Sequence, residues 1–367
     1  MTIAETTGAK REEFLVVSDV DSHAQCRMRV IVEDGRIVEV HGVPDDPESK
    51  GELSTREEHV KELVYAPDRL QYPMKRKGER GAGQWVRISW DEALNTIAAR
   101  LQAIKEADGA EAIDFHHGHY HSGEIFGVYL SRLANLLGSP NVTNPSHICL
   151  LPRAFMQFYV DFGAIVPPDI PHTHCIVLWG GNPKASNRTQ EIAIREARAR
   201  GAKLIVIDPR RTAYAEEADI HVQLRPGTDG ALALGLLNVV ITEQLYDAAF
   251  VEHWTTGFDK LAEHVKEYAP EKVAGITWVA AETVRAVARM YASAKPACIS
   301  PRNALDGHTN ASCAIRAIDL LMAITGNIDV KGGNVIQIPA SRALRIFGSR
   351  TCCRRFNGKR SSVATAR

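Results

Sequence analysis

The stretch Cys175-Ile-Val-Leu-Trp-Gly-Gly-Asn-Pro183 decides the fold of this chain. It is a short apolar run followed by two glycines, and a second run of the same kind is Lys203-Leu-Ile-Val-Ile-Asp-Pro-Arg-Arg211. Between them, residues 189–200 carry charges of alternating sign, which predicts a helix, and Gly201 closes it. Buried runs on either side of a helix are typical of a βαβ unit in a parallel sheet.

Ligands of parallel sheets bind beyond the carboxyl ends of the strands, so the residues that follow these runs are candidates for a nucleotide-cofactor site. Glycine lets the backbone approach a phosphate, arginine forks bind phosphate oxygens, and a carboxylate accepts from ribose or a base. The candidates are Trp179, Gly180, Gly181, Asn182 and Pro183, then Asp208, Pro209, Arg210 and Arg211, then Gly227, Thr228 and Asp229. Two alternatives remain: a sheet without any ligand, and for Asp229 plain capping of the next helix.

Composition narrows the class of protein. The 367 residues are 45% hydrophobic and 24% charged, which is ordinary for a soluble α/β chain of more than one domain. The formal charge is zero, but residues 341–367 hold eight Lys or Arg and no acid, which leaves 36 basic against 44 acidic residues before them. An acidic body predicts no nucleic-acid partner. No apolar run reaches membrane-spanning length, and seven scattered cysteines without a leader pattern predict a reduced, cytoplasmic protein.

The rest of the chain predicts α/β organisation with a small β-rich N-terminal domain. Residues 14–17, 27–32 and 36–40 alternate as strands, with a hairpin turn over 33–36. Ser89 and Glu92 form a capping-box pattern ahead of a helix, and further helices are expected around 229–243, 282–294 and 312–325, with a strand at 297–300. We expect domains at 1–80, 81–150 and 151–330, followed by an atypical end at 331–367, with Rossmann-like doubly wound α/β domains after the first.

Several phrases now support a family resemblance. With the three loop segments above occur Tyr65-Ala-Pro-Asp-Arg-Leu70, Arg87-Ile-Ser-Trp-Asp-Glu-Ala93, Leu137-Gly-Ser-Pro-Asn141 and Leu320-Leu-Met-Ala-Ile-Thr-Gly326. In this order they resemble the molybdopterin-guanine-dinucleotide oxidoreductases, the dimethyl sulfoxide reductase family, over roughly residues 14–340. The wording is similar to that of acetylene hydratase and its relatives. The resemblance implies a molybdenum or tungsten bis(molybdopterin guanine dinucleotide), with phosphates and guanine held by the three loop segments.

The resemblance also assigns a metal ligand. In the family this ligand is a Cys, selenocysteine, Ser or Asp in the loop after Gly-Ser-Pro-Asn, and Cys149 stands there. A soft thiolate suits such a metal, whereas the residue alone equally describes a small buried core thiol. His147 is either a proton carrier at the catalytic site or a loop residue. Arg153 is either a substrate clamp or a phosphate contact.

Many members of the family bind a [4Fe–4S] cluster through four N-terminal cysteines. The corresponding positions here are Asp19, Ser22, Cys26 and Ser54. One thiolate cannot hold a cluster that normally takes four, so this comparison predicts no [4Fe–4S] cluster. Arg56 stands where a lysine often bridges cluster and pterin, and we expect it to offer the pterin a cation.

Two further segments allow several interpretations. His116, His117, His119 and His121 form either a metal site, a strand-end loop in which Tyr120 or His119 contacts cofactor or substrate, or a solvated loop. The basic end is a solvated or disordered tail, a polyanion-binding arm, or the result of truncation or a reading-frame change.

We therefore predict an enzyme: the N-terminal portion of the catalytic subunit of a molybdenum- or tungsten-bis-pterin oxidoreductase of anaerobic metabolism. Its reaction would be oxygen-atom transfer, hydroxylation or dehydrogenation of a small-molecule substrate, with an electron-transfer subunit or a C-terminal half on a separate chain as possible partners. The alternatives are a non-redox hydratase or transhydroxylase of the same family, or a truncated, non-catalytic fragment that binds a pterin dinucleotide. An ordinary nucleotide-dependent enzyme is disfavoured, because no GxGxxG follows the first strand.

Overall fold

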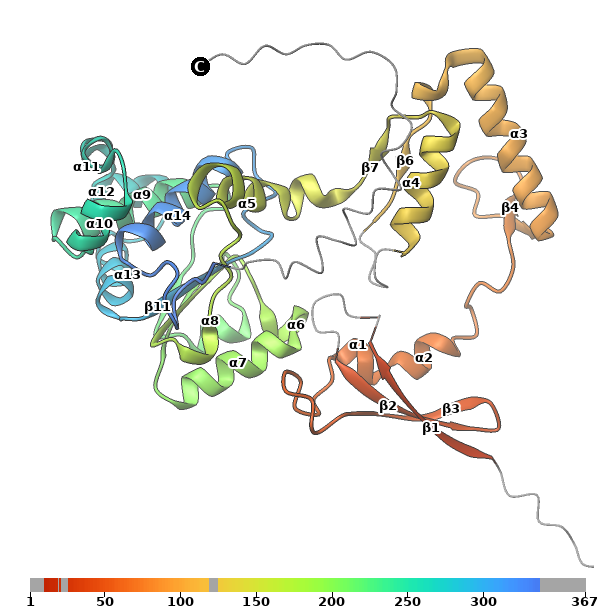
Figure 1. Cartoon of the computed structure of the whole chain (residues 1–367), viewed down its shortest axis with the longest axis horizontal. Helices are drawn as coiled ribbons and strands as arrows, with labels where there is room; N and C mark the ends of the chain where they lie inside the picture. Colours follow the sequence, from red (N-terminus) through yellow and green to blue (C-terminus); the bar gives the residue numbers. More distant parts are fainter. Residues whose placement is uncertain (1–9, 19, 21–25, 119–124, 337–367) are drawn as a thin grey trace, which may run out of the picture.

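A four-stranded parallel sheet forms the centre of the largest unit (Figure 1). The computed structural model describes residues 10–18, 20, 26–118 and 125–336. The strand order is β10-β9-β8-β11, and all three pairs are parallel. The strands are β8 (Cys175–Trp179), β9 (Lys203–Ile207), β10 (Ile220–Val222) and β11 (Ala297–Pro301). The predicted βαβ unit is confirmed, because α7 (Arg188–Ala199) connects β8 to β9. The wider doubly wound arrangement stays a prediction.

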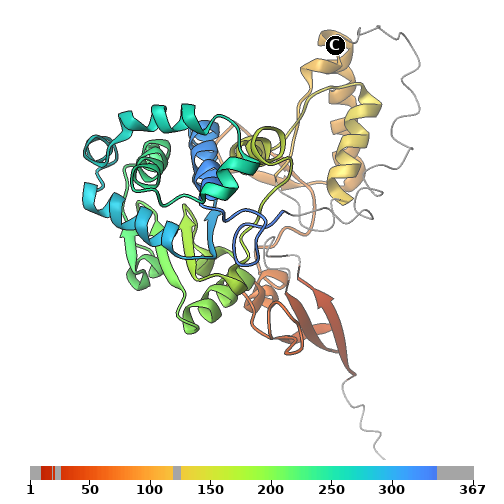
Figure 2. The ribbon, with the colours of Figure 1, turned by 60° about the vertical axis from the view of Figure 1, so that its left-hand side comes forward.

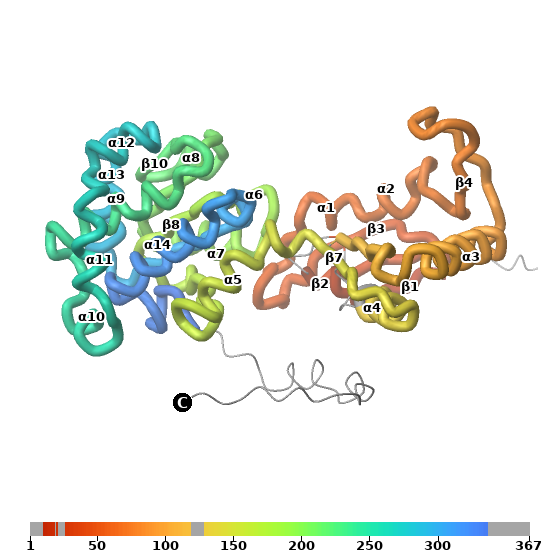
Figure 3. Tube along the Cα trace, turned by 90° about the horizontal axis from the view of Figure 1, so that it is seen from above, coloured from red at the N-terminus to blue at the C-terminus, as the bar shows by residue number. Residues whose placement is uncertain are grey.

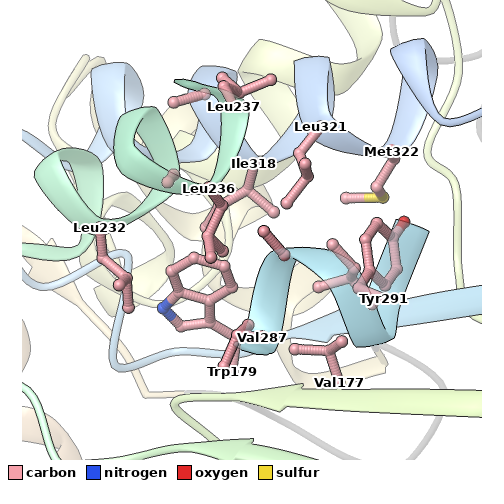
Figure 4. Close-up of a cluster of buried hydrophobic side chains, with 14 of the residues drawn as sticks. Val177, Trp179, Leu232, Leu236, Leu237, Val287, Tyr291, Ile318, Leu321 and Met322 are labelled. Carbon is pink, nitrogen blue, oxygen red and sulfur yellow. The ribbon is translucent and has the colours of Figure 1, made fainter. Parts of the chain in front are cut away.

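Side-chain alternation along β8 divides the core between the two faces of the sheet. Cys175, Val177 and Trp179 point into one cluster, and Ile176 and Leu178 point into the other. Figure 4 shows Val177 and Trp179 directed toward a layer of helices, where they meet leucines, isoleucine, valine, methionine and tyrosine. Every residue of β8 is at most 2% exposed, so this strand is apolar throughout because both of its faces are covered.

Helices cover both faces of the sheet (Figure 2). On one side lie α9 (Asp229–Thr242), α13 (Ala281–Ser293) and α14 (Ala311–Ile324), which confirm the three predicted helices. On the other lie α7 and α8 (Ala213–Glu217). Short helices that the sequence patterns did not predict complete the unit: α6 (Pro183–Ser186), α10 (Ala248–Trp254), α11 (Phe258–Val265) and α12 (Pro270–Thr277). A π-helix over Met156–Asp161 continues α5 (Leu151–Phe155).

Two asparagine side chains satisfy the outer edge of β11. Asn334 is fully buried; its Oδ1 accepts from the Ile299 N–H at 2.9 Å, and its Nδ2 donates to the carbonyl oxygens of Ile299 and Val166. Asn327 Oδ1 accepts from the Ala297 N–H at 3.0 Å. An open strand edge presents unpaired backbone groups, and here amide side chains take the place of a further strand.

The N-terminal unit is a three-stranded antiparallel sheet of β1 (Arg11–Val17), β2 (Arg27–Glu33) and β3 (Arg36–Gly42). Its predicted hairpin turn places Asp34 and Gly35 at φ of 48° and 78°, the left-handed region that a tight hairpin needs. Two helices follow, α1 (Thr55–Glu58) and α2 (Val60–Val64). A reciprocal capping box starts α1: Ser54 accepts from the Glu57 N–H, and Glu57 accepts from the Ser54 N–H.

Between these two units in the sequence comes a smaller one, drawn in orange to yellow in Figure 3. It contains β4 (Met74–Arg76), β5 (Trp85–Arg87), α3 (Trp90–Asp108), β6 (Phe115–His116), α4 (Ile125–Leu137) and β7 (Val142–Thr143). Ser89 caps α3 as predicted, accepting from the Glu92 N–H at 3.1 Å. The expected apolar face of α3 is only partly buried, since Leu101 and Ile104 pack against this unit's core while Leu94 and Ile97 are more than half exposed. The predicted domain boundaries stay predictions.

Within the part of the chain that is described, no helix has the length and apolar character needed to cross a membrane.

Replacing Asn334 with Ala should lower the free energy of unfolding by about 3 kcal/mol, because one buried N–H and two carbonyl oxygens lose their partner. Urea unfolding followed by circular dichroism measures the change. The matched control is Asn95→Ala, which removes an exposed amide from α3 and should cost less than about 0.5 kcal/mol. Equal losses in the two variants would contradict the edge-capping role of Asn334.

Candidate functional site at the carboxyl edge of the parallel sheet

The register of the parallel strands brings the predicted loops to one edge of the sheet. Trp179 pairs with Ile207 and with Pro301, and Ile207 pairs with Val222, so these four strand ends are level. The segments that follow them therefore emerge side by side. Residues 180–183, 208–211, 227–229 and 302–308 share this edge.

The first loop is shaped by close packing against the loop after β11. Gly180 has a φ of +66°, and a Cβ built there would lie 2.7 Å from Ala304 Cβ. A Cβ on Gly181 would collide with the side chain of Arg302. Both glycines are thus required by protein packing, and their contact with a phosphate stays a prediction. Asn182 precedes α6, whose first residue is Pro183. The buried Oδ1 of Asn182 has no hydrogen-bond partner among the described residues.

The second loop combines a buried carboxylate with two exposed cations. Asp208 is 4% exposed, and its Oδ1 accepts from the Arg210 N–H at 2.8 Å. The side chains of Arg210 and Arg211 are 74% and 76% exposed, and each makes one long ion pair, with Asp208 at 3.7 Å and with Glu216 at 3.9 Å. The Pro209 carbonyl oxygen accepts from Gln223 Nε2. This loop therefore offers two exposed guanidinium groups on a hydrogen-bonded turn.

The third loop meets the first through a buried hydrogen bond. The indole Nε1 of Trp179 donates to Asp229 Oδ1 at 2.8 Å. Asp229 is the first residue of α9, whereas Thr228 occupies the N-cap position and its hydroxyl donates to the Arg225 carbonyl oxygen. Asp229 therefore does not act as a side-chain N-cap, which was the simpler alternative. Gly227, at a φ of +81°, makes the turn before it.

Cys149 lies at the same edge of the sheet. It follows the 3₁₀ turn Pro145–Ile148, has a free, half-buried thiol, and its Sγ is 3.3 Å from Nδ2 of Asn303 in the loop after β11. His147 is exposed, and its Nδ1 is 2.8 Å from the Asn144 carbonyl oxygen. A carbonyl oxygen only accepts, so Nδ1 carries the hydrogen, and in the neutral ring the lone pair is on Nε2. The structure thus separates Cys149 from the fully buried core thiols Cys175 and Cys298.

Arg153 joins the Cys149 loop to the loop after β11. Its Nε donates to Asp306 Oδ2 at 2.7 Å and its Nη1 to the Pro301 carbonyl oxygen at 2.8 Å. Its Nη2 donates to the Cys149 carbonyl oxygen at 2.9 Å and to Asn303 Oδ1 at 3.1 Å. The Asp306 side chain is fully buried, and the Arg153 side chain is 13% exposed. Burial raises the pKa of Asp306, although the charge and hydrogen bonds of Arg153 lower it. Arg153 is occupied by protein acceptors, so neither predicted ligand contact is supported.

A cavity of about 1070 Å³ adjoins the Cys149 loop. Its wall includes Leu150, Arg153, Gln190, Ser300 and Arg302. The Arg302 guanidinium donates to Gln190 Oε1, and Gln190 Nε2 donates to Ser300 Oγ at 3.1 Å. Burial, and then the nearby charge of Arg153, lower the pKa of Arg302. One part of the cavity wall is therefore polar and carries the cations Arg153 and Arg302, whereas the rest of the lining includes Glu48, Glu196 and several apolar side chains.

Sequence reasoning missed Arg302, Asn303 and Asp306. A signal for them existed, because they directly follow the strand predicted at 297–300, and ligands of parallel sheets gather at such ends. What the sequence did not show is their pairing with Cys149 and Arg153, about 150 positions earlier in the chain.

Other predicted residues lie elsewhere or outside the description. Arg56 is exposed on α1 and has no hydrogen bond or ion pair among the described residues. His116 Nδ1 contacts Thr143 Oγ1 at 3.0 Å. Tyr120, His119 and His121 lie outside the described residues, as do Asp19, Ser22 and the basic end of the chain. Over the described ranges, no group of three or more His, Cys, Asp or Glu side chains is arranged to hold a metal ion.

Two protein-family models match the chain. The molybdopterin oxidoreductase family matches residues 69–358, and the molybdopterin oxidoreductase Fe4S4 domain matches residues 23–65.

The second match corrects the sequence prediction. It points to a [4Fe–4S] cluster, so the prediction that the chain has none is wrong. The prediction counted cysteines, whereas the family match reflects the whole segment. Within residues 23–65, Cys26 is the one cysteine and is buried beside Met28, Val30 and Leu53, while Ser54 caps α1. One buried thiol does not fit a four-thiolate set, so we assign no catalytic step to a cluster.

Individual relatives agree with the first match. The chain is 33% identical over 325 residues to the probable oxidoreductase YoaE of Bacillus subtilis, covering 88% of this chain and 48% of that protein. It is 41% identical over 276 residues to the acetylene hydratase of Syntrophotalea acetylenica, covering 75% and 37%. The solved acetylene hydratase from Pelobacter acetylenicus superimposes with a TM-score of 0.78 at 36% identity, covering 89% and 45%. The chain spans less than half the length of each.

The buried carboxyl group at the third loop predicts a pH dependence of stability. Burial raises the pKa of Asp229 above its usual value, more than the Trp179 hydrogen bond and the His308 charge lower it. The folded state therefore holds this proton more tightly than the unfolded chain. That contribution is complete below the unfolded pKa of about 4 and is lost as the pH rises through the folded pKa.

The variant Asp229→Asn cannot ionise, so its free energy of unfolding relative to the wild type should rise between pH 4 and pH 8. Denaturant unfolding at several pH values measures it, with the exposed Asp259→Asn as the control that should show no such trend. A relative stability of Asp229→Asn that falls with pH would contradict the assignment.

Proposed function

The chain belongs to the molybdopterin oxidoreductase family, and we propose that it carries the metal-ligand loop and one pterin-dinucleotide site of a molybdenum- or tungsten-dependent oxidoreductase. The observation that carries the proposal is the position of Cys149. Its thiol contacts the loop after β11, at the sheet edge that also bears residues 180–183, 208–211 and 227–229. A soft metal ligand and a nucleotide-binding edge are thereby adjacent.

The described side chains fit a bound dinucleotide. Arg210 and Arg211 are exposed cations that can bind phosphate oxygens as planar forks. Asn182 has a buried amide oxygen without a hydrogen-bond partner in the described part of the chain, and an N–H or hydroxyl donor of the ligand would satisfy it. Asp208 and Asp229 provide buried carboxylate oxygens for ribose or guanine donors, which supports a guanine rather than an adenine nucleotide.

Each chain residue then has a proposed task. When bound, the metal supplies Lewis acidity or a two-electron couple. Cys149 holds it from the protein side, and the half-buried position of the thiol limits the access of water. The Nδ1 contact of His147 leaves Nε2 as the site of proton exchange, so the neutral ring can accept a proton near this loop and release it to solvent. The substrate would be a small molecule. For redox reactions, the proposal includes an electron-transfer partner.

A second function within the family is hydration without net redox change, and the similarity to acetylene hydratase in both sequence and structure favours it. The two reactions are separable by assay. Hydration of acetylene yields product without a dye reductant, whereas oxygen-atom transfer consumes a reduced viologen. The geometry at Cys149 is compatible with both reactions.

Elemental analysis of anaerobically purified protein, with identification of the nucleotide released by acid, tests the proposal. We expect molybdenum or tungsten together with guanine nucleotide, and two guanines per metal would indicate the bis-pterin form. Adenine nucleotide, or protein that binds neither metal nor nucleotide under conditions that load its relatives, would overturn it.

The variant Cys149→Ala should lower bound metal by more than about tenfold, because loss of a direct ligand costs at least as much as loss of an outer partner. The matched control is Cys313→Ala, which removes an exposed thiol outside this loop and should keep wild-type metal content. Unchanged metal content and spectra in Cys149→Ala would remove Cys149 from the metal site.

A further inference from the structure

We infer that Asn303 is a positioning residue that donates a hydrogen bond to the Cys149 sulfur, and that the buried Arg153–Asp306 pair sets the orientation of its amide. This inference rests on the proposed role of Cys149 as the metal ligand. It assigns a function to Asn303 and Asp306, which no sequence pattern singled out, and gives Arg153 a role other than the two that the sequence predicted.

The contact with sulfur is direct. Asn303 Nδ2 lies 3.3 Å from Cys149 Sγ, a normal length for a hydrogen bond to sulfur. The two residues are 154 positions apart, so the contact depends on how the Cys149 loop docks on the loop after β11. A backbone bond from Asp306 N–H to the Asn303 carbonyl oxygen, at 3.0 Å, closes the turn that carries Asn303.

The hydrogen bonds determine which way the amide points. An asparagine amide has two orientations that exchange its oxygen and nitrogen. Here Oδ1 accepts from Arg153 Nη2 at 3.1 Å, and a guanidinium group can only donate. The amide oxygen must therefore face Arg153, which leaves the N–H donors directed toward Sγ.

Arg153 is itself fixed. Its backbone N–H and Nε both donate to the carboxylate of Asp306, at 3.2 and 2.7 Å, and Nη1 donates to the Pro301 carbonyl oxygen. The Asp306 side chain is fully buried. A buried ion pair costs desolvation energy and is best justified where it fixes geometry. This one links the end of β11 to the Cys149 loop, since Nη2 also donates to the Cys149 carbonyl oxygen.

The chemical consequence concerns the electron density on sulfur. Hydrogen bonds to sulfur ligands, like other outer-shell contacts, tune the reduction potential of a metal site. An N–H donor withdraws density from the thiolate and favours the reduced, more electron-rich state of the site. We therefore expect Asn303 to raise the reduction potential and to hold Sγ in one position.

Redox titration followed by electron paramagnetic resonance tests this on the metal-loaded protein. The reduction potential should fall in Asn303→Ala, which removes the donor, and fall further in Asn303→Asp, which places an anionic oxygen beside sulfur. The control is Asn310→Asp on the same segment; it adds the same charge, but Asn310 Nδ2 donates to the Gly227 carbonyl oxygen and not to Cys149. Its potential should stay near that of the wild type.

Arg153→Lys tests the orienting pair. Lysine keeps the charge but lacks the planar fork, so it cannot bind Asp306 and Asn303 together. We expect its potential to fall as in Asn303→Ala, although Asn303 is intact. A purely structural role for Arg153 would lower the melting temperature and leave the potential of the folded, metal-bound protein unchanged, which would overturn the orienting role.

A measurement without metal separates this inference from the proposed function. In protein labelled with ¹⁵N-asparagine, the side-chain amide resonance of Asn303, assigned by its loss in Asn303→Ala, should shift in Cys149→Ala and not in Cys313→Ala. No shift in Cys149→Ala means that the hydrogen bond is absent and overturns the inference. A shift together with unchanged metal content in Cys149→Ala supports the contact and overturns the metal-ligand role instead.

Discussion

The structure depends on one strand that is enclosed from every side. β8 pairs with β9 and β11 on its two edges, and helices cover both of its faces, so each of its side chains is buried. A strand in this position cannot shift by one residue without moving Trp179 from one core to the other. The carboxyl end of β8 therefore has a fixed position, and so do the first residues of the loops that follow β8, β9 and β11.

The Cys149 loop obtains its position from the same edge through polar contacts. It comes from a separate part of the chain and is attached by the Arg153–Asp306 pair and by the Pro301 carbonyl oxygen. Apolar packing is non-directional, so it does not by itself set the angles of a polar loop. Directional bonds to a buried carboxylate and a strand end set both distance and angle, as the proposed role of Cys149 as a metal ligand would require.

Sequence patterns gave the parts of the fold that arise from local order. The apolar runs of β8 and β9, the turn at Asp34 and Gly35, and the helices α9, α13 and α14 follow from periodicity and from turn residues. Sequence patterns do not predict contacts between residues that are far apart in the chain. The contact of Asn303 with Cys149 spans 154 positions, and no pattern in either segment announces it. The prediction that residues 23–65 bind no [4Fe–4S] cluster is wrong for another reason. It rests on four cysteine positions, whereas the Fe4S4-domain match extends over the whole segment.

The choice of a neutral amide beside the sulfur has a physical reason. Arg153 donates to the backbone carbonyl oxygen of Cys149, and Asp306 balances its charge. Between Arg153 and the Cys149 sulfur stands the neutral amide of Asn303. A guanidinium bonded directly to sulfur would neutralise the thiolate and weaken it as a metal ligand. An amide donates more weakly, so it can adjust the electron density without competing with a metal. The Arg153–Asp306 pair thus orients the Asn303 amide. The amide then donates to the Cys149 sulfur without bringing the charge of Arg153 into contact with it.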